Sequence, residues 1–274
     1  MTQPGFAEIA ALAHRRAGIV LTEDKTYLLE TRLGPVLQRF ALGSLGALGQ
    51  KLRALPGEAL ERAVVEALTT HESSFFRDGR PFEHLRAILP GRIAAKRAGD
   101  RVRIWSAACS TGQEAYSVAM LATELLGTGA PGRLDILATD ISGDVLARAK
   151  DASFSQFEVQ RGLPARALVT HFTQDGARWR LRPALRAMVR FEEHNLLSDG
   201  ASLGRFDVIF CRNVLIYFDA PTKTRVLEML ARHLLPDGVL YLGAAETVIG
   251  LTDRLAPIPD QRGAYGIPPR KAVA

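Results

Sequence analysis

From about residue 100 the sequence alternates between short apolar runs and longer segments with helical periodicity, and no other feature restricts the possible folds as strongly. Apolar runs with the length of buried strands occupy residues 101–107, 134–139, 188–192, 206–211 and 238–243. Helices are predicted between these runs, at residues 114–126, 145–150 and 221–234. Because strands that alternate with helices form parallel sheets covered on both faces, we predict an α/β domain with a doubly wound sheet.

One segment of this region, residues 154–182, does not follow the alternation. It contains Asp175-Gly176, a pair that is typical of a tight hairpin turn. We therefore expect a small antiparallel β-subdomain inserted at the edge of the main sheet.

Residues 5 to about 70 have a helical pattern throughout. Apolar residues between Phe6 and Ala13 form one face of a first helix, and Gly18 indicates its end. Thr22, followed by two acidic residues, predicts the start of a second helix, which Gly34-Pro35 should break or kink.

Third and fourth helices are expected near residues 45–55 and 58–69, so residues 1–75 are predicted to form an all-helical domain and residues 76–274 the α/β domain. The helical domain has a basic surface, either a solvated helix face or a docking face for an acidic partner. Its basic residues are Arg15, Arg16, Arg32, Arg39, Lys51 and Arg53.

The composition is that of an ordinary globular protein, with 47% hydrophobic and 23% charged residues among 274. The N-terminal residues lack the features of a signal peptide, and no run reaches the roughly 20 apolar residues of a membrane span. Cys109 and Cys211 fit neither a metal-ligand spacing nor a disulfide framework, so we expect no metal and a cytoplasmic location. The net charge of +6 suits nucleic acid, an anionic membrane or an acidic protein, or simply reflects arginine-rich genome composition.

The turn after the first predicted strand, Ser106 to Gly112, consists of small residues that let a ligand approach the backbone closely. It lacks the G-x-G-x-x-G spacing and the lysine that accompany bound phosphates. A nucleoside without phosphates, such as S-adenosylmethionine, fits this turn better than a nucleotide does. A tight turn without a ligand is the alternative.

Three further polar groups follow predicted strands, where a doubly wound sheet binds its ligands. Asp140 can accept both ribose hydroxyls, although aspartate is also a common helix cap. Asn195-Leu196 could contact the adenine edge, and Arg212-Asn213 is followed one helical turn later by Tyr217. Together these groups predict a cofactor crevice.

At the domain junction, the run from Thr69 to Asp78 combines hydroxyls, two aromatic residues and an arginine. Phe75 and Phe76 are expected to pack in the interdomain core. The guanidinium of Arg77 suits a carboxylate of the cofactor or the substrate.

Read in order, these motifs resemble the chemotaxis-receptor glutamate methyltransferases, the CheR family. The motifs are TTHESSFFRD, RIWSAACSTGQEAYS, ILATDIS, NLL, FDVIFCRNVLIYFD and LLPDGVLYLGAAE, together with GIVLTEDKTYLLETRL near the N-terminus. The resemblance covers nearly the whole chain. It implies an all-helical domain followed by a Rossmann-like S-adenosylmethionine-dependent methyltransferase domain with a small antiparallel β-subdomain.

Matched position by position, the resemblance implies a set of cofactor contacts and a set of residues near the reacting atoms. The cofactor contacts are His71, Ser73, Arg77, Glu114, Asp140, Asn195, Leu196, Arg212 and Asn213. Tyr217 would stand beside the transferred methyl, with Arg77 and Arg92 as candidates for orienting the substrate. His71 replaces an asparagine common in the family, and no motif anchors Arg92.

The implied reaction moves a methyl group from S-adenosylmethionine to receptor glutamates and needs no general base, because a glutamate is already ionised at neutral pH. The short hairpin at Asp175-Gly176 resembles members that do not grip a C-terminal receptor pentapeptide. The expected partner is the cytoplasmic methylation region of chemotaxis receptors, bound by a monomer without membrane insertion or nucleic acid. The alternatives are a nucleic-acid methyltransferase, a nicotinamide oxidoreductase and a non-catalytic binding or scaffold protein.

Overall fold

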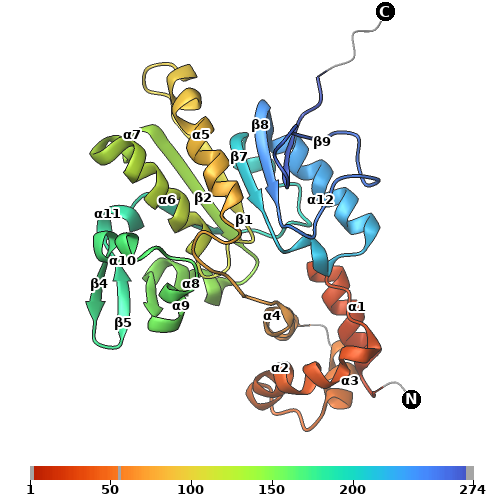
Figure 1. Ribbon diagram of the computed structural model, residues 1–274. Helices are drawn as coiled ribbons and strands as arrows, with labels where there is room; N and C mark the ends of the chain where they lie inside the picture. The colour runs from red at the N-terminus through yellow and green to blue at the C-terminus, as the bar shows by residue number, and fades with distance from the viewer. Residues whose placement is uncertain (1–2, 55–56, 270–274) are drawn as a thin grey trace, which may run out of the picture. The chain divides into compact units, whose positions relative to one another are not determined.

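A computed structural model describes residues 3–54 and 57–269, which form two compact units (Figure 1). The first unit comprises the chain up to Thr70 together with Tyr217–Lys223, and the second comprises His71–Ile216 and the chain from Thr224 onward. Residue 55, the predicted end of the third helix, and residue 56, which precedes the predicted fourth helix, lie outside the described residues.

The first unit is built from four helices, as the sequence predicts. They are α1 (Phe6–Ala17), α2 (Thr26–Arg39), α3 (Leu45–Ala54) and α4 (Glu58–Leu68), with a 3₁₀ turn, η1, at Glu23–Lys25. Their apolar faces meet at Ile9, Leu33, Leu48 and Val64, whose side chains are completely buried. Gly18 ends α1 in the left-handed conformation, which confirms the predicted stop.

The second helical segment starts where the sequence predicts, because Thr22 is the N-cap of η1 and η1 continues directly into α2 at Thr26. Thr22 makes no side-chain capping bond, and the hydroxyl of Thr26 donates to the carbonyl of Glu23. The predicted break in this helix is wrong. Gly34-Pro35 does not end α2, which continues to Arg39. Proline removes one backbone hydrogen bond, but Leu29, Leu33 and Val36 stay buried along one face, and this packing holds the helix together.

The second unit contains the predicted doubly wound sheet, with seven strands in the order β6-β2-β1-β7-β8-β10-β9. The strands are β1 (Val102–Ala107), β2 (Leu134–Asp140), β6 (Val189–Glu193), β7 (Phe206–Cys211), β8 (Leu234–Leu242), β9 (Ala256–Pro257) and β10 (Ala264–Gly266). The first five in spatial order pair in parallel, whereas β10 pairs antiparallel with β8 and β9. The strand order reverses between β1 and β7.

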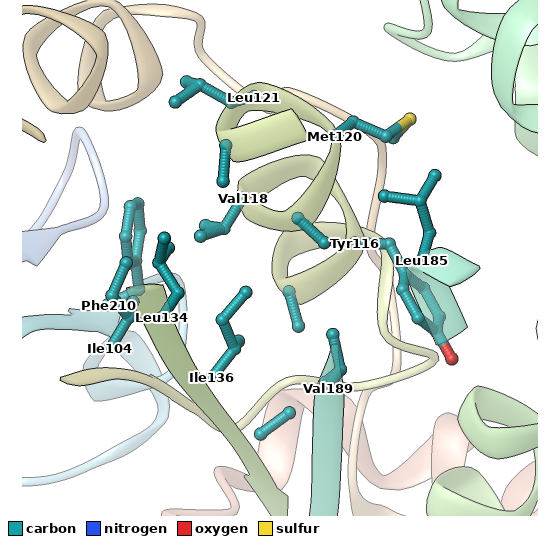
Figure 2. Packing of buried hydrophobic residues seen from close by; sticks show 14 of the residues in the cluster. Ile104, Tyr116, Val118, Met120, Leu121, Leu134, Ile136, Leu185, Val189 and Phe210 are labelled. Atoms are coloured by element: carbon teal, nitrogen blue, oxygen red, sulfur yellow. The ribbon is translucent and has the colours of Figure 1, made fainter. Parts of the chain in front are cut away.

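Helices cover the sheet because its strands are apolar on both faces. The helices α5 (Arg80–Ala95), α6 (Gln113–Leu126) and α8 (Gly143–Asp151) share one apolar cluster with alternate strand residues such as Ile104, Ile136 and Phe210. Figure 2 shows Val118 of α6 on the side of the helix that faces Leu134 and Ile136, and the ring of Tyr116 beside Leu185. The helix α12 (Ala220–His233) connects β7 to β8, so the chain here moves along the sheet in the direction opposite to the step from β1 to β2. Because such crossovers are right-handed, α12 lies on the face of the sheet opposite to α6.

The predicted insertion is a separate three-stranded antiparallel sheet in the order β3-β5-β4. Its elements are β3 (Ser153–Ser155), α9 (Gln156–Gln160), α10 (Ala165–His171), β4 (Phe172–Asp175) and β5 (Arg178–Leu181), followed by α11 (Pro183–Arg186). The predicted hairpin is present, but its turn is Gly176-Ala177, one residue later than the predicted Asp175-Gly176, because Asp175 belongs to β4 and pairs with Arg178. The remaining short elements are η2 (Gly127–Gly129), α7 (Ala130–Arg133), η3 (Ala201–Leu203) and η4 (Leu215–Tyr217).

The strand predicted at 238–243 begins earlier than its sequence indicates. β8 starts at Leu234, which pairs with Phe206, and the register shifts before Val239 pairs with Val208. Pro236, Asp237 and Gly238 lie in this irregular stretch, so residues that are typical of a turn are accommodated inside the strand. Across the described ranges, no helix has both the length and the apolar character that crossing a membrane requires.

Candidate functional site

The predicted cofactor residues of the second unit gather where the parallel strands end. β1 and β7 pair through Ala107 and Cys211 at their last residues, and β2 ends on Asp140. The loops that follow these strands therefore start side by side at the point where the strand order reverses. Open α/β sheets bind their ligands in the crevice at such a point.

The loop after β1 has an unusual backbone. Ala108, Ser110 and Gly112 have φ values of 59°, 53° and 90°, so every second residue is left-handed. The amide of Cys109 donates to the carbonyl of Thr139 at 2.8 Å, which ties the loop to β2. Left-handed backbone at non-glycine residues is costly and clusters at functional sites.

Asp140 fixes the same loop from the end of β2. One of its carboxylate oxygens accepts from the amide of Ser110 at 2.9 Å, and the other accepts from the amide of Ser142 at 3.2 Å. The side chain is almost fully buried. Each carboxylate oxygen can accept two hydrogen bonds, so these two bonds leave acceptor capacity for ligand hydroxyls.

Arg212, directly after β7, joins three segments that are far apart in sequence. Its Nη1 donates to Glu114 of α6 at 3.0 Å, and its Nη2 donates to Asp78 at 2.6 Å and to the carbonyl of Arg77 at 2.8 Å. Glu114 also accepts from the hydroxyl of Ser106 at 2.7 Å. This network, buried at Arg212 and Glu114 and exposed at Asp78, brings the predicted residues Arg77, Glu114 and Arg212 together.

Arg77 directs part of its side chain back along its own segment, where Nη1 donates to the carbonyl of Glu72 at 3.1 Å. His71 and Ser73 are half-buried in the same stretch. The two neighbouring phenylalanines pack against residues of the second unit. Phe75 lies edge-to-face with Phe154 at 5.0 Å, and Phe76 lies edge-to-face with Phe82 at 5.3 Å.

Asn195 and Leu196 follow β6, the neighbour of β2. The side-chain oxygen of Asn195 accepts from the amide of Leu197 at 3.0 Å, which turns the chain immediately after the strand. Leu196 is buried. The amide of His194, the residue before Asn195, donates to the carbonyl of Asp140. Asn195 and Leu196 therefore lie close to Asp140, at the carboxyl ends of the strands.

Among the described residues, four side-chain atoms directly after the strands β1, β6 and β7 are buried without any hydrogen-bond partner. They are the hydroxyl of Ser110, Nε2 of His194, Nε of Arg212 and Oδ1 of Asn213. A buried polar atom without a partner is costly, so such atoms mark places where a bound polar molecule would supply the missing bond. Asn213 is also left-handed, with a φ of 58°.

Of the predicted residues, Arg92 is not brought to this edge by the structure. Arg92 lies near the opposite end of the sheet, where its guanidinium donates to the carbonyl of Asp237 and lies 3.6 Å from the Asp237 carboxylate. Tyr217 belongs to the first unit, where its carbonyl accepts from the amide of Val20 at 2.9 Å.

The two cysteines border the edge but are not nucleophiles. Burial raises the pKa of Cys109, and the carboxylates of Asp140 and Glu114 add to the effect. Burial likewise raises the pKa of Cys211, followed by the carboxylates of Glu246 and Glu114. Both thiols stay protonated at neutral pH, and no cluster suited to a metal occurs among residues 3–54 and 57–269.

Sequence reasoning did not single out Ser106, Ser110, Asp78 or Glu246 as parts of the site. Asp78 stands beside Arg77 in a quoted motif, and its charge opposite Arg212 could have indicated an ion pair. Ser106 and Ser110 were recognised only as small residues. Glu246 is the last residue of the quoted motif LLPDGVLYLGAAE, but that motif gives no sign that its side chain binds backbone amides after β7.

The fold and this edge define a class: an α/β protein that binds a nucleoside cofactor at the reversal of strand order. Comparison with known families agrees. Residues 4–69 match the model "CheR methyltransferase, all-alpha domain", and residues 71–264 match "CheR methyltransferase, SAM binding domain". The chain belongs to the CheR methyltransferase family, and S-adenosylmethionine is the cofactor of its second unit.

Curated relatives match along nearly their whole length. The chemotaxis protein methyltransferase Cher2 of Pseudomonas putida is 41% identical over 90% of this chain and 92% of its own, and chemotaxis protein methyltransferase 1 of Pseudomonas aeruginosa is 43% identical over the same shares. The chemotaxis protein methyltransferase of Escherichia coli is 35% identical over 91% of this chain and 86% of its own. A solved DszA carbon methyltransferase aligns with a TM-score of 0.41 and 18% identity over 90% of this chain and 54% of its own, too distant to indicate a reaction.

The residues at the edge fit S-adenosylmethionine by their donor and acceptor types. The partnerless Oδ1 of Asn213 can accept from an amino group, and the partnerless Nε of Arg212 and hydroxyl of Ser110 can donate to a carboxylate. Asp140 offers acceptors for hydroxyls. The loop between β1 and α6 has neither the glycine spacing nor the lysine that a phosphate would need, and this cofactor has no phosphate.

Proposed function

We propose that the protein transfers a methyl group from S-adenosylmethionine to glutamate side chains of methyl-accepting chemotaxis receptors, forming methyl esters. The observation that carries this proposal is the match of both domains and nearly the whole chain to chemotaxis protein methyltransferases. The buried network around Arg212 and the partnerless polar atoms at the sheet edge support the binding half of the reaction.

The protein needs only to bind the cofactor, to orient the substrate glutamate and to exclude water. When bound, S-adenosylmethionine supplies the electrophilic methyl group on its sulfonium. A glutamate carboxylate, with an ordinary pKa of about 4.3, is already the ionised nucleophile at neutral pH, so no side chain has to remove a proton. Alignment of reacting groups can lower a barrier by roughly 7–11 kcal/mol.

Residue roles follow from position. Asp140 would accept the ribose hydroxyls, Asn195 and Leu196 would contact the base, and Arg212, Asn213 and Glu114 would hold the amino-acid end. His71, Ser73 and Arg77 would complete the site from the segment before α5. Tyr217 would orient the attacking oxygen beside the methyl, and Arg77 would orient the glutamate. Arg92 has no role in this scheme, because Asp237 holds its guanidinium at the other end of the sheet.

The test is transfer of radiolabelled methyl to a purified receptor cytoplasmic domain, with RNA as a second acceptor. We expect label on the receptor that is released by mild base, as a methyl ester requires. A receptor with its methylated glutamates changed to alanine serves as the control. Label on RNA would favour a nucleic-acid methyltransferase, and cofactor binding without any transfer would favour a scaffold.

We further propose that receptor recognition does not depend on a C-terminal pentapeptide. The β4–β5 hairpin has strands of four residues joined by a two-residue turn, which leaves little sheet edge for a peptide. Receptors with and without the pentapeptide should be methylated equally, and micromolar binding of the peptide by calorimetry would contradict this proposal.

A further inference from the structure

The carboxylate of Glu246, in the loop after β8, is surrounded by backbone amides. Its Oε2 accepts from the amides of Asn213 at 2.8 Å and Gly243 at 2.6 Å. Its Oε1 accepts from the amides of Val214 at 2.9 Å and Ile216 at 3.3 Å. One almost fully buried side chain thus accepts four backbone hydrogen bonds.

These bonds connect the loops that follow two neighbouring strands. β7 and β8 pair up to Cys211 and Leu242, so residues 213–216 and Gly243 leave the sheet at adjacent points of its carboxyl edge. Hydrogen bonds from amides to an ionised carboxylate are stronger than those between neutral groups. Glu246 therefore fixes the course of the segment 213–216 against the loop after β8.

The fit around Glu246 leaves no spare room. A Cβ added at Gly243 would lie 2.7 Å from Oε2 of Glu246 and 2.9 Å from both the amide nitrogen and Nδ2 of Asn213. Asn213 itself holds a left-handed backbone that a free chain would avoid. The segment is thus held in one costly conformation by a carboxylate on the neighbouring loop.

Glu246 has no atom left for a direct part in the reaction, since each oxygen already accepts two amides. We propose that Glu246 is the positioning residue of the methyl-transfer site. It sets the backbone of Asn213, a proposed cofactor contact, and the direction in which the chain enters Tyr217 directly after Ile216. The effect of Glu246 on methyl transfer rests on the proposed function, whereas its role in fixing the backbone of residues 213–216 does not.

The isosteric variant Glu246→Gln separates a hydrogen-bonding role from packing. Glutamine has the same shape but keeps only one acceptor oxygen, and its amide group would face two N–H donors. We expect Glu246→Gln and Glu246→Ala to lower turnover about 100-fold, as a misplacement near 1 Å can, while affinity for adenosylhomocysteine falls less than tenfold. Glu83→Gln, at an exposed position on α5, is the matched control.

A second measurement does not depend on catalysis. Amide hydrogen exchange followed by NMR should show protected amides at Asn213, Val214 and Ile216 in the unmodified protein and faster exchange in Glu246→Gln. Gly243→Ala should also speed the exchange of these amides, because the added methyl group would displace the carboxylate of Glu246. Rapid exchange of these amides in the unmodified protein would overturn the inference even if every variant failed to fold.

Other results also decide the question. A Glu246→Gln variant with unchanged turnover overturns the positioning role, whether or not exchange accelerates. If the unmodified protein protects these amides and loses that protection in Glu246→Gln but methylates no receptor, the proposed function fails, and the backbone contact of Glu246 remains.

Discussion

The buried guanidinium of Arg212 shows how single side chains organise the cofactor edge. It faces two carboxylates, Glu114 and Asp78, and its own side chain is only 2% exposed. An ion pair at such depth contributes little net stability by itself, but loss of the guanidinium would leave the carboxylate of Glu114 buried and uncompensated, whereas Asp78 is exposed. Arg212 therefore fixes the position of α6 relative to the segment before α5, apart from its proposed contact with the cofactor.

Arg212→Met should lower the free energy of unfolding by roughly 3–5 kcal/mol, because Glu114 keeps only the hydroxyl of Ser106 as a partner. Arg212→Lys should recover part of the loss, and Arg225→Met, at an exposed position of α12, should have little effect. Urea unfolding followed by circular dichroism measures all three. A loss below 1 kcal/mol for Arg212→Met would show that the network is not stabilising.

Asp140→Asn should weaken binding of adenosylhomocysteine tenfold or more, a change of about 1.4 kcal/mol, measured by calorimetry. The amide group of asparagine would face either the Ser110 or the Ser142 amide, so the loop loses an acceptor together with the ribose contact. Tyr217→Phe is the contrast: it should lower turnover and leave this affinity nearly intact. Unchanged affinity in Asp140→Asn would remove the ribose assignment.

At the scale of elements, α12 begins with a capping arrangement that the sequence analysis did not identify. Asp219 precedes the helix and accepts from the amide of Thr222 at 2.9 Å, and its other oxygen lies 2.9 Å from Nε2 of His14. Hydrogen bonds from Thr222, and then His14, lower the pKa of Asp219 from 3.8 to about 2. A single carboxylate thus caps α12 and binds α1 within the first unit.

Asp219→Ala should destabilise the protein by about 1 kcal/mol at pH 5, the usual cost of losing an N-cap. Because the pKa is lower in the folded state, the contribution of the ionised carboxylate is present above pH 3.8 and is lost as the pH falls toward 2. The difference between the unmodified protein and Asp219→Ala in urea unfolding should therefore be smaller at pH 3 than at pH 5. A difference that grows toward pH 3 would contradict the lowered pKa.

Helices and strands could be predicted where their own side chains determine their position. The apolar runs located the five parallel strands, and Gly18 located the end of α1. Pro35 inside α2 and the start of β8 at Leu234 were not predictable, because packing and a register shift decide them. At the site, polar residues after strands pointed to Asp140 and Arg212, whereas Glu246 binds only backbone amides, which every sequence possesses.

For the whole molecule, charge offers the clearest link to a partner. Several basic residues of the first unit are engaged by its own acids: Arg15 and Arg16 lie 3.6 Å from Glu61, and Arg53 contacts Glu8. Arg39 and Lys51 are exposed. A net charge of +6 still favours an acidic partner through long-range attraction.

Raising the salt concentration from about 0.1 M to about 1 M should lower kcat/KM for the receptor domain, because the screening length between exposed charges falls from about 10 Å to about 3 Å. Lys51→Glu should lower the same constant at low salt and weaken its salt dependence. Affinity for adenosylhomocysteine should respond to neither change. Salt-independent methylation would exclude an electrostatic docking surface on the first unit.

The alternating left-handed residues after β1 limit how this protein can be engineered. Ala108 and Ser110 already carry the steric cost of that backbone, and a β-branched side chain at either position would raise it further. Glycine would relieve the cost, and at a left-handed position this relief exceeds the loss from the greater freedom of the denatured chain. A directed-evolution library should therefore restrict these two codons to glycine, alanine, serine and asparagine, with glycine expected to raise thermal tolerance.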